Sequence, residues 1–283
     1  MAEEEKQMEI LYNMASLEWL EYGFMRNALL AVVMITPLFG LLSTMVVSNR
    51  MAFFSDSLGH GAFTGLALGA ILGIFSPVES LLLFSVFFAL LITWIKNHST
   101  ASTDTIIGVF SSLGIAAGLM MMSYGGSFNK YASYLIGDIL SITPGELKSL
   151  AVVLAVVVLA WIWLFNRLLI LSINSSFARS RGVSTMLVEG IFAAMVAVVV
   201  AISIQWVGLL IINSLLVLPG AAARNIAGSI KQYHLLSVLF AVVSGVSGLV
   251  LAYYCSMAAG ATIVVIAAGI FFVTLLLKRK FLK

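Results

Sequence analysis

Two side chains that could bind a metal ion or carry a proton stand four residues apart in an otherwise apolar stretch, residues 51–69. They are Asp56 and His60, and on a helix they would lie on one face. An Asp oxygen and a neutral His nitrogen are common ligands of divalent transition metals. The pair could equally relay protons, or Asp56 could cap the helix while His60 makes a hydrogen bond in a polar core. Residue types and spacing alone leave these interpretations open.

The chain around this pair has the composition of a membrane protein. Of its 283 residues, 61% are hydrophobic and 10% are charged, whereas a soluble domain has about 25% charged residues. The apolar runs are continuous and about 17–20 residues long, which is typical of membrane-spanning helices and not of barrel strands. We therefore expect an all-α polytopic membrane protein, in which ionisable groups line the bundle interior or a water-filled path.

Nine hydrophobic segments follow an acidic, amphipathic N-terminal tail, residues 1–27. Two of them are short and rich in Gly or Pro, and the second of these two could fail to span the membrane. The sequence thus predicts about eight or nine transmembrane helices within one membrane domain, residues 28–283. The nine segments are 28–47, 58–74, 78–95, 105–124, 149–168, 187–204, 207–222, 235–254 and 258–277.

The Lys and Arg residues of the loops predict the orientation. If the C-terminus is cytoplasmic and there are nine spans, eleven of these bases lie in inside loops and four lie outside. The N-terminus is then outside. Residues 131–140, YASYLIGDIL, also lie outside and are too short to span, so we expect a short re-entrant or interfacial helix there. Asp138 in this segment is either part of an outer gate or a local cap.

The longest inside loop is residues 169–186. Asn174, Ser175 or Ser176 could cap a short helix in it, and Gly182 could end that helix. A short cytoplasmic helix suits docking to a soluble partner, although a solvated basic loop is the other interpretation.

Two expected absences limit the function further. The sequence has no GxxxxGK[ST] phosphate-binding loop, so we expect no ATP hydrolysis by this chain. A lone cysteine, Cys255, excludes an internal disulfide and a cysteine metal site.

Five segments in order resemble one family, the membrane permeases of bacterial zinc, manganese and iron ABC importers (ABC-3 family). The chain departs from the family at Asn174-Ser175, where Asp-Pro is common, and at the LPG of 218–220, which often reads Leu-Pro-Ala. The matching segments are FSDSLGHGAFTGLALG at 54–69, DTIIG at 104–108, YLIGDIL at 134–140, VGLLIINSLLVLPGAAAR at 207–224 and AAGATIVVIAAGIFF at 258–272.

The resemblance implies a transport subunit of the bacterial plasma membrane. Its expected partners are a second permease chain, identical or related, two copies of a cytoplasmic ATP-binding subunit, and an extracytoplasmic metal-binding protein. It implies that Asp56 and His60 lie on the pathway. Zinc, manganese or iron would be the cargo, with no permanently bound cofactor and no nucleic-acid partner. An ion-coupled secondary transporter and a non-transporting scaffold remain as alternatives, and the sequence does not choose the metal.

Overall fold

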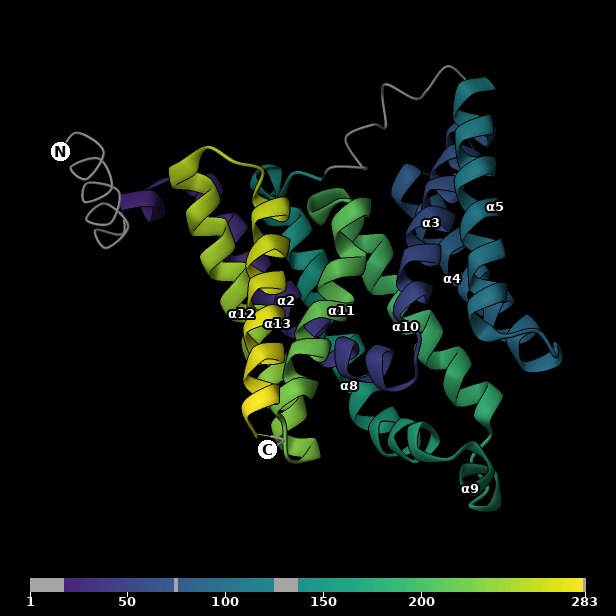
Figure 1. Cartoon of the computed structure of the whole chain (residues 1–283). Coiled ribbons are helices and arrows are strands. Elements are labelled where there is room, and N and C mark those ends of the chain that lie inside the picture. Colours follow the sequence, from purple (N-terminus) through teal and green to yellow (C-terminus); the bar gives the residue numbers. More distant parts are fainter. Residues whose placement is uncertain (1–17, 74–75, 125–136, 282–283) are drawn as a thin grey trace.

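The structure is a computed structural model that describes residues 18–73, 76–124 and 137–281 (Figure 1). Over these residues it contains ten α-helices and two short 3-10 helices, and no strand. The predicted class, an all-α polytopic membrane protein, is confirmed.

Nine helices of 18 residues or more correspond in order to the nine predicted hydrophobic segments within the described ranges. Seven of these are long and apolar enough to cross a membrane. The other two, α3 and α11, correspond to the two short predicted segments, 58–74 and 207–222, which are rich in Gly or interrupted by Pro. The nine are α2 (Gly23–Ser48), α3 (Ala52–Leu72), α4 (Pro77–His98), α5 (Thr103–Tyr124), α8 (Pro144–Ile173), α10 (Thr185–Val207), α11 (Leu209–Ile226), α12 (Ile230–Cys255) and α13 (Ala259–Phe281).

Figure 1 shows how these helices are arranged. Helices α3, α4 and α5 lie together on one side, α12 and α13 lie on the other, and α10 and α11 lie between them. Helix α2 packs against α8, α11 and α12 and is largely buried. Gly40 lets α12 approach α2 closely, since a Cβ atom at Gly40 would lie 2.7 Å from the Cα atom of Val238.

Local sequence explains where several helices begin and end. Helices α4 and α8 each start with a capping box followed by Pro, from Ser76 to Glu79 and from Thr143 to Glu146. Helix α3 ends at Gly73, whose φ of 64° is left-handed. These signals fix the ends of helices whose interiors are almost uniformly apolar.

The predicted helix in the loop 169–186 is confirmed as α9 (Ser175–Ser180). The Oδ1 atom of Asn174 accepts hydrogen bonds from the N–H groups of Ser176 (2.8 Å) and Phe177 (3.0 Å). Gly182, with a φ of 74°, follows the helix and lets the chain turn toward α10. Figure 1 shows α9 at the same end of the molecule as the C-terminal end of α13.

The predicted outer helix over 131–140 lies mostly outside the described residues, as does most of the predicted tail. The described part of the tail holds η1 (Glu18–Glu21), and α2 already begins at Gly23. Asp138 caps η2 (Ile139–Ser141), because its Oδ1 atom accepts the N–H of Leu140 at 3.1 Å. The capping role left open by the sequence is therefore present at Asp138.

Candidate functional site

Helix α3 holds Asp56 and His60 one turn apart, so their side chains meet on one face. The Nε2 atom of His60 lies 3.4 Å from the Oδ2 atom of Asp56. The residue at the N-cap position of α3 is Met51, and Asp56 lies inside the helix. The hypothesis that Asp56 caps this helix is therefore wrong. We call these two residues the Asp–His pair.

Helix α5 rests directly on the turn of α3 that carries the pair. A Cβ atom at Gly114 would lie 3.0 Å from the backbone nitrogen of Gly61 and 3.1 Å from the carbonyl carbon of His60. The Thr64 hydroxyl donates a 2.6 Å hydrogen bond to the carbonyl oxygen of Gly114. Contact through backbone and small residues fixes the position of α3 more tightly than flexible side chains would.

A groove of about 390 Å³, lined by both polar and apolar residues, opens beside the pair, between α3 and α5. The Ser111 hydroxyl in it donates a hydrogen bond of 3.4 Å to the Oδ2 atom of Asp56. The Asp56 side chain is 39% exposed and that of His60 is 16% exposed, so the carboxylate is the more accessible of the two groups. The groove is lined by Phe53, Asp56, Asp104, Ile107, Gly108, Ser111 and Ser112.

Sequence reasoning did not place Ser111 or Asp104 at this site. The two residues are seven positions apart, which puts them on the same face of α5. The spacing indicates a shared polar face on this helix, but it does not indicate which other helix that face contacts.

A second contact joins α3 to α11. The Ser55 hydroxyl donates a 2.5 Å hydrogen bond to the Oδ1 atom of Asn213 on α11. Asn213 is one of the polar residues that interrupt the apolar segment 207–222. Its side chain thus connects α11 to α3 one residue before Asp56.

The geometry of the pair suits bidentate metal binding. Two ligands of a tetrahedral zinc ion, at about 2.0–2.1 Å from the metal, lie about 3.3 Å apart, close to the 3.4 Å between the Asp56 and His60 atoms. Within the described residues no group of three or more His, Cys, Asp or Glu side chains could hold a metal. Counting the described residues, one copy of the chain therefore offers two such ligands, at the Asp–His pair.

Comparison with known proteins agrees with this architecture. The model of the ABC 3 transport family matches residues 21–278. The chain belongs to this family. This ABC 3 transport family member is therefore a multi-pass membrane protein, and its sequence-based assignment to the family is confirmed.

Individual relatives cover nearly the whole chain. It is 27% identical to the high-affinity zinc uptake system membrane protein ZnuB of Buchnera aphidicola, over 88% of this chain and 96% of that protein. It is 29% identical to the manganese import system permease protein ScaB of Streptococcus gordonii, over 93% of this chain and 95% of that protein. The structure of PsaBC from Streptococcus pneumoniae superposes with a TM-score of 0.81, at 27% identity, over 93% and 95% of the two chains.

Proposed function

We propose that this chain is the permease subunit of an ABC importer that carries a divalent transition metal ion, zinc, manganese or iron, into the cell. The observation that carries the proposal is the Asp–His pair, with a 3.4 Å separation suited to one metal ion, beside an open groove that Asp56 itself lines. Full-length similarity to permeases named for zinc and for manganese supports it. The two relatives' names differ in metal, and the ligand types suit zinc, manganese and iron.

The groove favours a second permease chain as the group that covers it. Only five of the 22 residues of α5 are buried, and its exposed residues include Val109, Leu113 and Met120. Lipid would cover the apolar residues readily, but it would leave the partly exposed Asp56 carboxylate against hydrocarbon at high cost. A twofold-related copy would instead bring a second Asp–His pair close, for four protein ligands in all. A related but different permease chain would cover the groove without that four-ligand symmetry.

Helix α9 is the proposed contact for the cytoplasmic ATP-binding subunits, of which two copies are expected. It projects from the end of the bundle (Figure 1), and its Phe177 side chain is 47% exposed. An exposed aromatic on a capped, rigid helix is a suitable anchor for a cleft in a soluble partner. An extracytoplasmic metal-binding protein would deliver the ion at the opposite end.

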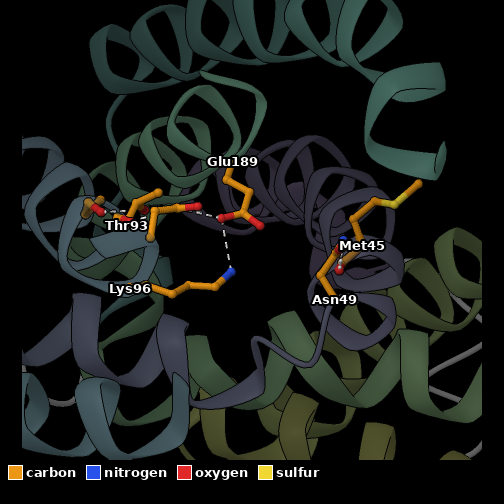
Figure 2. Close-up of polar contacts among 7 residues, drawn as sticks. Met45, Asn49, Thr93, Lys96 and Glu189 are labelled. Atoms are coloured by element: carbon orange, nitrogen blue, oxygen red, sulfur yellow. Dashed lines mark hydrogen bonds and ion pairs between the residues drawn. The ribbon is translucent and has the colours of Figure 1, made fainter. Parts of the chain in front are cut away.

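A largely buried ion pair connects α10, the helix that follows α9, to α4. Glu189 lies on α10, directly after α9 in the chain, and its Oε2 atom is 3.1 Å from the Nζ atom of Lys96 on α4 (Figure 2). The Asn97 side chain donates a 3.0 Å hydrogen bond to the same oxygen. Helix α4 packs against α3. A displacement of α9 by a docked partner would therefore be transmitted through α10 and α4 to α3, which carries the Asp–His pair.

The proposal predicts ATP-dependent metal uptake. The chain, co-expressed with a partner ATPase and reconstituted in vesicles, should accumulate radioactive zinc or manganese only when ATP and the ATPase are present. Uptake that needs a proton gradient and no ATP would instead favour the secondary transporter, with Asp56 and His60 as a proton relay. No uptake under any condition would favour a scaffold.

The orientation makes a separate prediction. Cys255 is exposed at the end of α12, and Ser176 is exposed on α9 at the opposite end of the bundle. In intact cells an impermeant thiol reagent should label Cys255. It should label Ser176→Cys, in a Cys255→Ala background, only after the cells are opened. Labelling of both positions from the same side would contradict an outside N-terminus and a cytoplasmic C-terminus.

A further inference from the structure

A basic pocket lies where the end of α8, the end of α9 and the start of α10 meet. It has a volume of about 430 Å³, and it is remote in the sequence from the groove beside the Asp–His pair. We call it the arginine pocket, since two arginines line it. Its residues are Trp163, Arg167, Arg181, Gly182, Val183, Ser184, Leu187 and Val188.

The two guanidinium groups of the pocket have aromatic neighbours but no acidic ones. The Cζ atom of Arg167 lies 4.0 Å from the centre of the Trp163 ring, and that of Arg181 lies 5.2 Å from the Phe177 ring. Among the described residues, the ion pairs join Asp56 with His60 and Glu189 with Lys96, so neither pocket arginine has a carboxylate partner. The pocket thus combines two positive charges with planar donors, a combination that suits a phosphate group.

The pocket also lies at the depth of a lipid headgroup. Lys148 and Arg167 are exposed on α8 and are nineteen residues apart, a rise of about 28 Å along a helix. This matches a hydrocarbon core of about 30 Å. The exposed residues between them include Val152, Val156, Leu159 and Ile162. Trp163 and Arg167 then follow at the end of this apolar face, in the order typical of a membrane interface.

We propose that the arginine pocket binds the phosphate of an anionic phospholipid. The phosphate would lie between Arg167 and Arg181, and the acyl chains would run along the exposed faces of Ile162 and Leu187. A soluble anion would use the two arginines but not these apolar faces. An acidic group of a docked ATPase would approach α9 from beyond the bundle end, whereas the pocket continues onto the side of α8 that faces lipid.

Bound lipid would connect three elements of the bundle end. Arg167 comes from α8, Arg181 directly follows α9, and Leu187 comes from α10. A phosphate between the two arginines would hold α9 at a fixed angle to the membrane plane. This inference needs only that the chain spans a membrane, and it does not depend on which ion is transported.

The test is a lipid titration of the purified full chain in detergent, followed by native mass spectrometry. Phosphatidylglycerol should bind more tightly than phosphatidylcholine with the same acyl chains. Removal of both charges, in Arg167→Gln with Arg181→Gln, should weaken phosphatidylglycerol binding about 25-fold, since each arginine near an anionic headgroup contributes about fivefold. Arg179→Gln is the matched control, because Arg179 lies on α9 but does not line the pocket.

Further arms separate the competing ligands. Inorganic phosphate and glycerol phosphate at millimolar concentration should displace little lipid. Full displacement would mean a soluble-phosphate site and would overturn the proposal. Unchanged phosphatidylglycerol binding by the double variant would also overturn it, and loss of the ATPase with unchanged lipid binding would reassign the pocket to that partner. Thermal unfolding of each variant checks that it is folded. If the double variant does not fold, the same lipid titration is made with Arg181→Gln alone.

Discussion

Replacement of Asp56 by Asn should reduce ATP-driven metal uptake by about 10- to 100-fold, while the chain still assembles with the proposed ATPase. Asn keeps the size and shape of Asp but removes the charge that balances a divalent cation. Changes even to residues that only support metal ligands cost about 10- to 100-fold. His60→Gln should have a similar effect, and the double variant should be little worse than either, because the two ligands act on one ion.

Asp104→Asn is the matched control for this experiment. Asp104 lines the same groove, but the Ser111 hydroxyl and the His60 ring contact Asp56. If the groove acted only by attracting cations, loss of either carboxylate would reduce uptake equally. Near-normal uptake by both Asp56→Asn and His60→Gln, with assembly intact, would leave the pair as a hydrogen-bonded contact on a packed helix.

The second large effect is expected at α9. Phe177→Asp should separate ATP hydrolysis from metal uptake or release the ATPase during purification. A buried aromatic anchor contributes about 30-fold or more to the affinity of a protein interface, and a buried unpaired carboxylate adds a further penalty. Copurification of the two subunits, ATPase activity and vesicle uptake, measured on one preparation, distinguish the two outcomes.

Two variants on the same helix show whether the aromatic ring is responsible. Phe177→Leu keeps an apolar side chain and should retain most of the coupling. Ser176→Asp places a negative charge one residue earlier, on an exposed position, and should leave the complex active if the Phe177 ring is the anchor. A fully active complex from Phe177→Asp would contradict the placement of the ATPase contact at α9.

Much of the fold follows from the sequence because a membrane imposes strong limits on it. Runs of apolar residues, separated by Pro, Gly and capping residues, predicted the nine long helices. The Asn174 and Gly182 signals predicted α9. The Asp–His pair was found because acids and imidazoles are rare within such segments. Each of these signals is local, so each can be seen without the tertiary structure.

The packing of the helices could not be predicted in the same way. The most apolar 18-residue stretches of α8 and α10 have nearly equal mean hydropathy, 2.4 and 2.5. In α8, however, 22% of that stretch is buried, whereas in α10 67% of it is buried. Lipid tails are as apolar as a protein core, so hydropathy does not separate a lipid-facing helix from a buried one. The contact of Ser111 with Asp56, which joins residues far apart in the chain, was missed for this reason.

The close packing that Gly114 allows between α5 and α3 suggests how the ion preference of the site could be changed. Because Gly114 of α5 packs directly against the backbone of His60 and Gly61, a shift of α5 would also shift the His60 imidazole. In the proposed two-copy assembly, the gap between the two histidines would then depend on how the outer faces of α5 meet, at exposed residues such as Val109 and Ser112. Protein engineers seeking a larger or smaller cavity for a different ion would therefore vary these outer positions and leave the ligands unchanged.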